Sequence, residues 1–326
     1  MTKIINWGII GCGNVTEVKS GPAFNKVNGS KLVAVMRRDA EKARDYAQRH
    51  KVPKWYSDAS ELIKDEEVSA VYVATPPDTH AEYAIMAMRA GKPAYVEKPM
   101  ALNFAQCQEM IRVSQQTGMP LFVAYYRRKL PGFLKIKELL DEGVIGKPRH
   151  FEIRFITPPR PEDHLEPLPW RVIPELSGGG YLHDLGSHQL DVMDFLLEPL
   201  KLVDSHAENN LGLYSPADFV RASFETDSGI KGTGIWDFGA RDKEHTDIIT
   251  ISGDKGTIEF SCFEFTTTKV ISEGKEILFD NPRPEHVQSG LIEFVTEEIR
   301  QGKNYKTNAI SASRATLLLD QISSHQ

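Results

Sequence analysis

Cysteine is scarce in this sequence, and long apolar runs are absent. Cys12, Cys107 and Cys262 are the only cysteines among 326 residues. They are too few and too far apart for a disulfide framework, and no Cys-x-x-Cys pair indicates zinc. No apolar run approaches the roughly 20 residues that span a bilayer, and the N-terminus lacks the pattern of a signal peptide. We therefore expect a reduced, cytoplasmic protein without a membrane partner.

An excess of basic charge is also missing. Lys and Arg together number 39 against 45 Asp and Glu, which gives a formal net charge of −6. A mildly acidic chain without a Lys/Arg block is a poor partner for a polyanion, so we expect no nucleic-acid binding. His, Asp and Glu do not cluster at metal-ligand spacing, and we expect no catalytic metal.

What the sequence does contain is a regular alternation over its first 125 residues. Aliphatic runs at Lys3–Ile10, Lys31–Met36, Ala70–Ala74, Ala94–Val96 and Leu121–Tyr125 alternate with helical stretches at Asp39–His50, Thr79–Ala90 and Asn103–Thr117. Such runs suit strands buried on both faces of a parallel sheet. Because strands that alternate with helices indicate βαβ units, residues 1–125 are predicted to form a Rossmann-type doubly wound parallel sheet.

The pattern changes in residues 126–326. Phe151, Ile153 and Phe155 alternate with polar residues, the period-2 sign of a half-buried strand. Further strands are expected at Val220–Glu225, Gly232–Asp237, Ile248–Ser252, Thr257–Ser261, Thr267–Ile271 and Glu276–Phe279, and helices at Pro131–Glu142, Tyr181–Leu197, Glu285–Gln301 and Ser311–Ser323. Short strands joined by turns indicate a largely antiparallel sheet. We therefore expect a C-terminal α+β domain, built on an open sheet, that binds substrate and supports oligomerisation.

A glycine-rich turn follows the first aliphatic run. It reads Gly11-Cys12-Gly13-Asn14-Val15-Thr16, between a predicted strand and a predicted helix. Glycines at such a turn let a pyrophosphate approach the backbone, and the free N–H groups of the next helix can receive it. Thr16 replaces the usual third Gly or Ala, so the pattern is imperfect. The alternative is an ordinary glycine turn, but its place after the first strand favours a dinucleotide site.

The end of the second run indicates which dinucleotide is bound. Arg37 and Arg38 follow Met36, where many NAD-binding folds carry an acidic residue for the ribose 2′-OH. An arginine there can pair with a 2′-phosphate and stack on adenine, so we predict NADP, with NAD as the alternative. Asp39 is either that acidic residue or the N-cap of the next helix.

Two further motifs supply groups for proton transfer. Lys98 follows the strand Ala94–Val96, and the carboxyl ends of parallel strands are where such sheets bind ligands. Asp184 and His188 are four residues apart on a predicted helix, so their side chains share one face. A lysine, a histidine and a carboxylate can move a proton to or from a hydroxyl while a hydride leaves its carbon.

With these motifs the sequence resembles the Gfo/Idh/MocA oxidoreductases, the family named for glucose–fructose oxidoreductase and inositol dehydrogenase. The resemblance covers nearly the whole chain. It rests on Gly11–Asn14, Thr75–His80, Glu97–Pro99, Gly143–Gly146, Trp170–Arg171 and the stretch Gly178–His188, which follows the pattern GGGxLxDxGxH.

The resemblance implies roles for individual residues. It makes Lys98 the lysine near the nicotinamide and the reacting oxygen, Asp184 the substrate-binding carboxylate, and His188 the proton-transferring histidine. It also implies that the cofactor is contacted by Glu97, beside the nicotinamide, and by Thr75, Pro76 and His80, along the ribose. Tyr126 stands where the family usually has asparagine.

Other residues near these motifs have two interpretations each. Trp170 and Arg171 either bind substrate or pack their loop. His183 either lines the site or points elsewhere. Asp191 either orients His188 or is an exposed helix acid. Trp236 is expected to pack within its sheet.

The resulting hypothesis is an NADP(H)-dependent oxidoreductase that transfers a hydride between nicotinamide and a sugar, polyol or related hydroxy or carbonyl compound. A homodimer or homotetramer through the second sheet is expected. One rival is a lyase, epimerase or glycosidase that retains its cofactor through turnover. The other is a non-catalytic regulator that senses NADP, which the presence of Lys98, Asp184 and His188 together disfavours.

Overall fold

The computed structural model describes residues 4–240, 245–302 and 307–324. Packing groups the chain into two compact units, which we call the first unit (Met1–Tyr126 with Pro284–Ser313) and the second unit (Arg127–Arg283 with Arg314–Gln326). The sequence predicts one division between residues 125 and 126, whereas residues 284–313 pack with the first unit. Apolar packing explains this return of the chain, because Leu291 and Val295 of α10 (Ser289–Arg300) belong to the buried core of the first unit.

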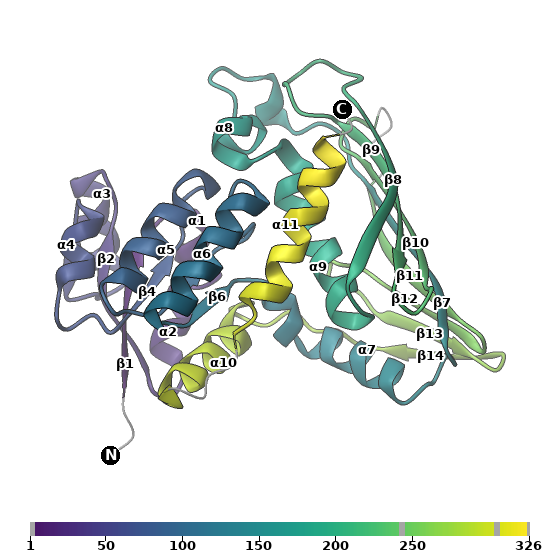
Figure 1. Ribbon diagram of the computed structural model, residues 1–326, viewed down its shortest axis with the longest axis horizontal. Helices are drawn as coiled ribbons and strands as arrows, with labels where there is room; N and C mark the ends of the chain where they lie inside the picture. Colours follow the sequence, from purple (N-terminus) through teal and green to yellow (C-terminus); the bar gives the residue numbers. More distant parts are fainter. Residues whose placement is uncertain (1–3, 241–244, 303–306, 325–326) are drawn as a thin grey trace. The chain divides into compact units, whose positions relative to one another are not determined.

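A parallel sheet forms the centre of the first unit (Figure 1). In the described residues it has six strands in the order β3-β2-β1-β4-β5-β6. They are β1 (Ile5–Ile10), β2 (Ser30–Met36), β3 (Lys54–Tyr56), β4 (Ala70–Val73), β5 (Ala94–Val96) and β6 (Leu121–Val123). All of its strand pairs are parallel. The predicted doubly wound sheet is therefore confirmed.

Helices connect these strands as the alternation predicts. They are α1 (Asn14–Val18), α2 (Ala23–Lys26), α3 (Ala40–Arg49), α4 (Ala59–Lys64), η1 (Pro77–Thr79), α5 (His80–Arg89) and α6 (Phe104–Thr117). Asn103 caps α6 by accepting from the Gln106 backbone N–H, and Gly118 ends it in the left-handed conformation. The sequence analysis missed β3 and α4, which are short.

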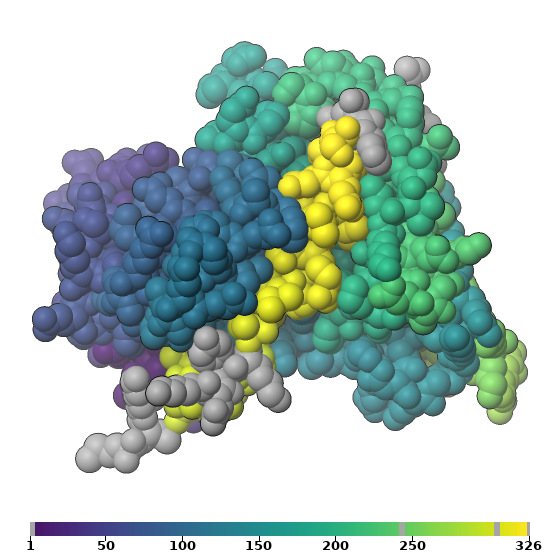
Figure 2. Space-filling view, in the orientation of Figure 1, coloured from purple at the N-terminus to yellow at the C-terminus, as the bar shows by residue number. Residues whose placement is uncertain are grey.

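Aromatic side chains dominate the core of the first unit. The Trp7 ring lies 5.0 Å from that of Phe24, and Tyr72 stacks on Tyr95 at 4.9 Å. Such pairs stabilise a core beyond the area that they bury. On the face shown in Figure 2, the side chains of α5 and α6 form a continuous layer, which agrees with the full burial of β4 and β5.

The second unit is built on a mixed, mostly antiparallel sheet. In the described residues it has eight strands in the order β14-β13-β12-β11-β7-β10-β9-β8. They are β7 (Pro148–Ile156), β8 (Leu200–Glu208), β9 (Phe219–Thr226), β10 (Lys231–Asp237), β11 (Thr246–Gly253), β12 (Gly256–Phe260), β13 (Thr268–Ser272) and β14 (Lys275–Phe279). Only β7 and β10 pair in parallel among these strands. The predicted antiparallel character is confirmed, although β8 was not expected.

Helices of 3 to 15 residues accompany this sheet. They are η2 (Tyr126–Lys129), α7 (Pro131–Asp141), η3 (Pro161–His164), η4 (Trp170–Val172), α8 (Pro174–Ser177), η5 (Leu182–Gly186), α9 (Ser187–Leu196) and α11 (Ala309–Ser323). The predicted helix Tyr181–Leu197 differs in its first part, because Leu182–Gly186 forms a π-helical turn before α9 begins. Such turns often occur at functional sites. No helix in the described ranges is both long enough and apolar enough to cross a membrane.

Candidate active site

The strand order of the first unit marks one edge of its sheet. The order reverses between β1 and β4, and sheets of this kind bind ligands outside the carboxyl ends of the strands at that point. Gly11 follows β1, Arg37 follows β2, and Glu97 follows β5 directly, while Thr75 comes two residues after β4. The candidate residues of the first unit thus gather at one sheet edge.

The turn after β1 has the geometry that its glycines predict. Gly11 has a φ of +92°, and a Cβ there would lie 2.7 Å from Thr75 Cγ2 and 2.8 Å from the Thr75 nitrogen. Its backbone N–H donates to Met36 O at 2.9 Å, which fixes the turn over the end of β2. Only glycine satisfies both the conformation and the close approach.

Gly13 is different, because protein packing does not require a glycine there. A Cβ at Gly13 would meet nothing nearer than Gly11 O, at 3.9 Å. The turn therefore leaves room beside its backbone, as an approaching pyrophosphate needs. The backbone of Asn14 and Val15 begins α1, whose first N–H groups have no partner within the helix. The residues present fit a dinucleotide phosphate.

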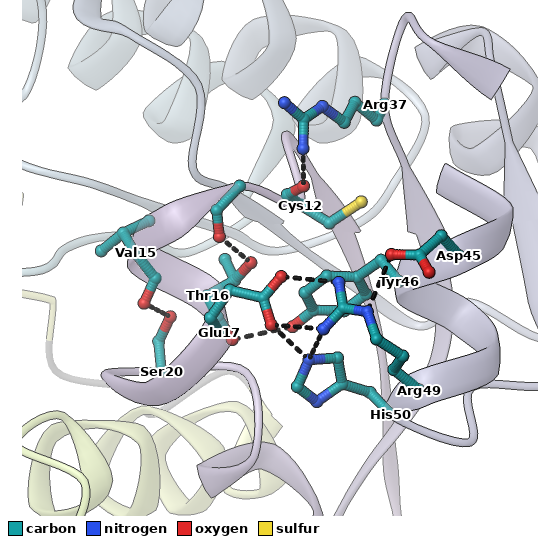
Figure 3. Close-up of polar contacts among 11 residues, drawn as sticks. Cys12, Val15, Thr16, Glu17, Ser20, Arg37, Asp45, Tyr46, Arg49 and His50 are labelled. Atoms are coloured by element: carbon teal, nitrogen blue, oxygen red, sulfur yellow. Dashed lines mark hydrogen bonds and ion pairs between the residues drawn. The ribbon is translucent and has the colours of Figure 1, made fainter. Parts of the chain in front are cut away.

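Thr16 compensates for the missing third glycine of the pattern. Its hydroxyl donates to Gly13 O at 2.8 Å, and its own carbonyl accepts from the buried Tyr46 hydroxyl at 2.8 Å (Figure 3). The side chain thus stabilises the turn. Cys12 in the same turn is fully buried, and burial raises the pKa of its thiol to about 11. It is therefore a packing residue rather than a nucleophile.

The three residues after β2 (Arg37, Arg38 and Asp39) differ in their exposure and in their contacts. Arg37 is half-buried and its guanidinium reaches back to Cys12 O at 3.3 Å, whereas Arg38 is exposed. Asp39 caps α3, since its side chain accepts from the Lys42 backbone N–H at 3.1 Å. Donation from Lys42 keeps the pKa of Asp39 below its usual value. Of its two predicted roles, the structure shows the N-cap.

A separate ion-pair cluster lies on the other side of Cys12 from Arg37 (Figure 3). Arg49 donates to both oxygens of Glu17 at 2.8 Å, and His50 contacts the same carboxylate at 2.7 Å. Hydrogen bonds from Arg49 lower the pKa of Glu17 to about 2. The Arg49 guanidinium is thus paired with carboxylate groups, and it links α3 to α1.

The Glu97–Lys98–Pro99 segment is held by its neighbours in the first unit. Glu97 is buried and Lys98 is half-buried, and the Lys98–Pro99 peptide is cis. The ring of His80 lies between Pro99 O, 2.9 Å from Nδ1, and Thr75 O, 2.8 Å from Nε2. Burial lowers the pKa of His80. Its ring therefore joins the turn at Thr75 and Pro76 to the peptide that follows Lys98.

In the second unit, the glycine run Gly178–Gly180 precedes the π-helical turn. Gly180 has a φ of +77°, and a Cβ there would lie 2.6 Å from Pro216 Cβ. His183 is buried, and its Nδ1 lies 3.1 Å from Gly179 O. Burial lowers the pKa of His183 to about 4, so the ring is neutral near pH 7. Its predicted place in the substrate site stays a prediction.

Three of the predicted substrate residues come together in the second unit. Arg171 Nε donates to Asp184 Oδ2 at 3.1 Å, with the arginine side chain 39% and the carboxylate 14% exposed. The Arg171 guanidinium also lies 4.6 Å from the centre of the Trp170 ring. The sequence analysis left loop packing open for Trp170 and Arg171. Arg171 thus contacts both Trp170 and the Asp184 carboxylate, and the predicted substrate binding by Trp170 and Arg171 stays a prediction.

His188 is the second residue of α9 and is buried. Its ring meets that of Phe263 edge to face at 5.9 Å. One turn further along α9, Asp191 accepts from Arg128 Nε at 2.9 Å and from Nη2 at 2.6 Å. Asp191 is 1% exposed, so its interpretation as an exposed helix acid is wrong. The predicted orientation of His188 by Asp191 stays a prediction.

Several structurally important residues were missed from the sequence. Asp194 pairs with Arg314 of α11 through two contacts of 2.6 Å. Gln288 and Tyr72 both donate to Glu97. No motif marks any of them, and Gln288 and Arg314 lie far along the chain from their partners. Trp236 packs in its sheet as predicted and donates to Gln189 Oε1 at 2.6 Å.

Lys98 belongs to the first unit, and Asp184 and His188 belong to the second. The candidate residues thus form two separate groups, each described within its own unit and each called a half-site below: one lies at the sheet edge with the glycine turn, and the other lies around the π-helical turn. Among the described residues, no three His, Cys, Asp or Glu side chains gather as metal ligands.

Comparison with known proteins agrees with this organisation. Residues 5–125 match the Gfo/Idh/MocA model described as an oxidoreductase family with an NAD-binding Rossmann fold, and residues 133–259 match the Gfo/Idh/MocA C-terminal domain. An oxidoreductase P35 of Formosa agariphila is 43% identical over 297 residues, which cover 90% of each protein.

Solved structures share the fold over the full length. KijD10, a 3-ketoreductase from Actinomadura kijaniata in complex with NADP and TDP-benzene, aligns with a TM-score of 0.85 at 22% identity, covering 99% of this chain and 98% of that one. A levoglucosan dehydrogenase in complex with NADH aligns with a TM-score of 0.88 at 20% identity, covering 99% and 97%.

Proposed function

Because the chain belongs to the Gfo/Idh/MocA family of oxidoreductases, we propose that it is an NADP(H)-dependent dehydrogenase or reductase of a sugar or polyol. The observation that carries the proposal is the sheet edge of the first unit. There the open glycine turn at Gly13 and the Lys98 segment follow strands of one parallel sheet. When bound, the nicotinamide supplies or accepts the hydride.

The preference for NADP(H) follows from the residues after β2. Arg37 is half-buried, lies against the backbone of the glycine turn and is positively charged, so it suits a 2′-phosphate. The nearest acid, Asp39, is occupied as the cap of α3. The position directly after β2 is thus an arginine, where NAD-specific sites usually have a carboxylate that accepts from the ribose 2′-OH.

The half-site in the second unit suits a polyhydroxylated substrate. The Arg171 guanidinium donates to the Asp184 carboxylate and orients it, so that the carboxylate can accept from substrate hydroxyls. His188 exchanges the proton of the reacting hydroxyl as general acid and base. Lys98 has the role of polarising the reacting oxygen, as the family resemblance implies. The levoglucosan substrate implied by the name of one structural neighbour agrees with a sugar.

The test is a screen of aldoses, ketoses, inositols and diols with NADP⁺ and NADPH, following absorbance of the reduced nicotinamide. With the best substrate, Lys98→Met and His188→Ala are each expected to lower kcat by about 10²–10⁴-fold. Lys64→Met, which changes an exposed lysine on α4, is the matched control and should match wild type. Turnover near wild type in both site variants would refute the mechanism.

Cofactor choice is tested separately. Arg37→Asp should weaken NADPH binding by about 10–100-fold relative to NADH, since a charged partner of the phosphate is lost. Arg44→Asp makes the same charge change at an exposed position of α3 and should leave the ratio unchanged. An unchanged ratio in Arg37→Asp would remove Arg37 from the 2′-phosphate site.

Association into a homodimer or homotetramer is supported by the outward side of the second sheet. Ile248, Ile271 and Leu278 are 39%, 36% and 60% exposed on its strands. The strand register places all three on one face of the sheet, and exposed apolar residues that share a face are typical of interfaces. Light scattering should give a multiple of the 36.6 kDa chain mass, and Ile271→Glu should reduce it. A monomer at micromolar concentration would exclude this arrangement.

A further inference from the structure

Gln288 is the buried N-cap residue of α10, and its side chain crosses to the sheet edge of the first unit. Its Nε2 donates to Glu97 Oε1 at 2.5 Å, and its Oε1 accepts from the Tyr95 hydroxyl at 2.9 Å. The NH₂ group and the carbonyl oxygen of the Gln288 amide thus both have hydrogen-bond partners, and these partners define the orientation of the amide. A side chain 191 positions away in sequence holds the residue before Lys98.

Glu97 itself is 6% exposed and is surrounded by donors. The oxygen that accepts from Gln288 also accepts from the Tyr72 hydroxyl at 2.5 Å. The other oxygen accepts from the backbone N–H of Lys98 at 3.2 Å. A buried carboxylate needs such partners, because losing one leaves its desolvation uncompensated. The Glu97 side chain therefore transmits the position of Gln288 to the Lys98 backbone.

The segment before α10 also contacts the C-terminal end of α1. His286 Nδ1 lies 2.7 Å from Val18 O, and the Gln288 backbone N–H donates to Lys19 O at 3.3 Å. These carbonyls belong to the end of α1, the helix that starts at the glycine turn. Gln288 is thus anchored through its backbone at the C-terminal end of α1 and through its side chain at Glu97, the residue before Lys98.

We propose that Gln288 is a positioning residue for the nicotinamide half of the cofactor site. Through Glu97 it sets the place of the Lys98 backbone, while its contact with α1 depends on the backbone alone. This inference rests on the proposed function. It predicts that changing the side chain affects binding of the nicotinamide half and leaves the binding of the adenine half intact.

The experiment compares two ligands that differ in the nicotinamide. NADPH carries it, and ADP-ribose 2′-phosphate lacks it. Gln288→Met keeps the approximate size of the side chain but removes both hydrogen bonds, and it should raise the Kd for NADPH about tenfold. The Kd for ADP-ribose 2′-phosphate should stay within about twofold. Gln116→Met, at an exposed position of α6, is the control and should change neither.

A charge swap separates positioning from general destabilisation. Glu97→Gln and Gln288→Glu each break the amide–carboxylate pair, so each should weaken NADPH binding. The double variant Glu97→Gln/Gln288→Glu restores the pair with reversed polarity, and Tyr72 can then donate to Ser20 Oγ, 3.2 Å away. We expect its Kd for NADPH to return to within about threefold of wild type. Hydrogen exchange of the Lys98 amide should slow in parallel.

The outcomes distinguish this inference from the proposed function. A wild-type chain that binds neither ligand refutes the function and the inference together. Wild-type binding of NADPH that is unchanged in Gln288→Met, or equal weakening of both ligands, overturns the role of Gln288 only. If Gln288→Met does not fold, the double variant decides: binding no tighter than that of Glu97→Gln alone overturns the inference.

Discussion

The ion pair between Arg128 and Asp191 should make the stability of the protein depend on pH in a specific way. Asp191 is 1% exposed, and burial raises its pKa to about 6 despite the adjacent guanidinium. Arg128→Met removes that guanidinium and leaves an unpaired buried carboxylate above this pH. Breaking a buried pair from one side costs about 3–5 kcal/mol. We expect a loss of this size in the free energy of unfolding at pH 8.

At pH 5 the same substitution should cost far less, about 1 kcal/mol, because Asp191 already carries a proton in wild type. The sign follows from linkage. A carboxyl group with a raised pKa in the folded state binds protons more tightly than when unfolded, so the free energy of unfolding falls as pH rises through that interval. Without Arg128 the pKa of Asp191 in the folded state rises further, so the free energy of unfolding falls by a larger amount as the pH rises. Urea unfolding at the two pH values, followed by tryptophan fluorescence, measures both losses.

Arg112→Met is the matched control for this experiment. Arg112 pairs with Glu109 on α6, but both side chains are exposed, at 50% and 42%. Exposed pairs contribute about 0–1 kcal/mol, so this variant should lose little at either pH. Equal losses for Arg128→Met at pH 5 and pH 8 would refute the electrostatic reasoning and indicate lost packing of the arginine stem.

Three further predictions concern single side chains. Burial lowers the pKa of His183 to about 4, so the free energy of unfolding of the wild type should fall by about 3 kcal/mol through this group between pH 7 and pH 4. His183→Gln should lack this contribution, which acid unfolding curves of the two proteins would show. Asp39→Ala should cost about 1 kcal/mol in urea unfolding, Asp39→Ser should recover most of it, and neither should change the ratio of NADPH to NADH affinity. Trp236→Phe leaves Gln189 Oε1 without its buried donor and should lower the free energy of unfolding by about 1–3 kcal/mol in the same assay.

Local patterns in the sequence were sufficient for most of the fold. The run ending at Ile10 and the turn at Gly11 predicted a strand and a bend, because buried parallel strands are continuously apolar. β3 was missed because it has three residues and an exposed Trp55, so no periodicity marks it. β8 was missed because its register shifts between Leu202 and Asp204, which breaks the alternation.

The candidate site was predicted only where its residues form short motifs. Glu97 and Lys98 could be found because they are adjacent in the sequence, and Arg37 because it follows a strand. Gln288 could not, since its partner lies 191 positions away and a lone glutamine before a helix carries no signal. The π-helical turn at Leu182–Gly186 was also not predicted, because a segment of five residues is too short to show a periodicity that differs from that of an α-helix.

The return of residues 284–313 to the first unit affects how the protein is made. When Tyr126 leaves the ribosome, every strand of the first sheet has been synthesised, yet Leu291, Ile292 and Val295, which complete its core, have not. At about 5–20 residues per second, roughly 10–30 s pass before α10 follows. During this time the nascent sheet lacks the apolar residues of α10 that complete its core, and Glu97 lacks its hydrogen bond from Gln288. The first unit, although first in the sequence, is completed only when nearly the whole chain has been translated.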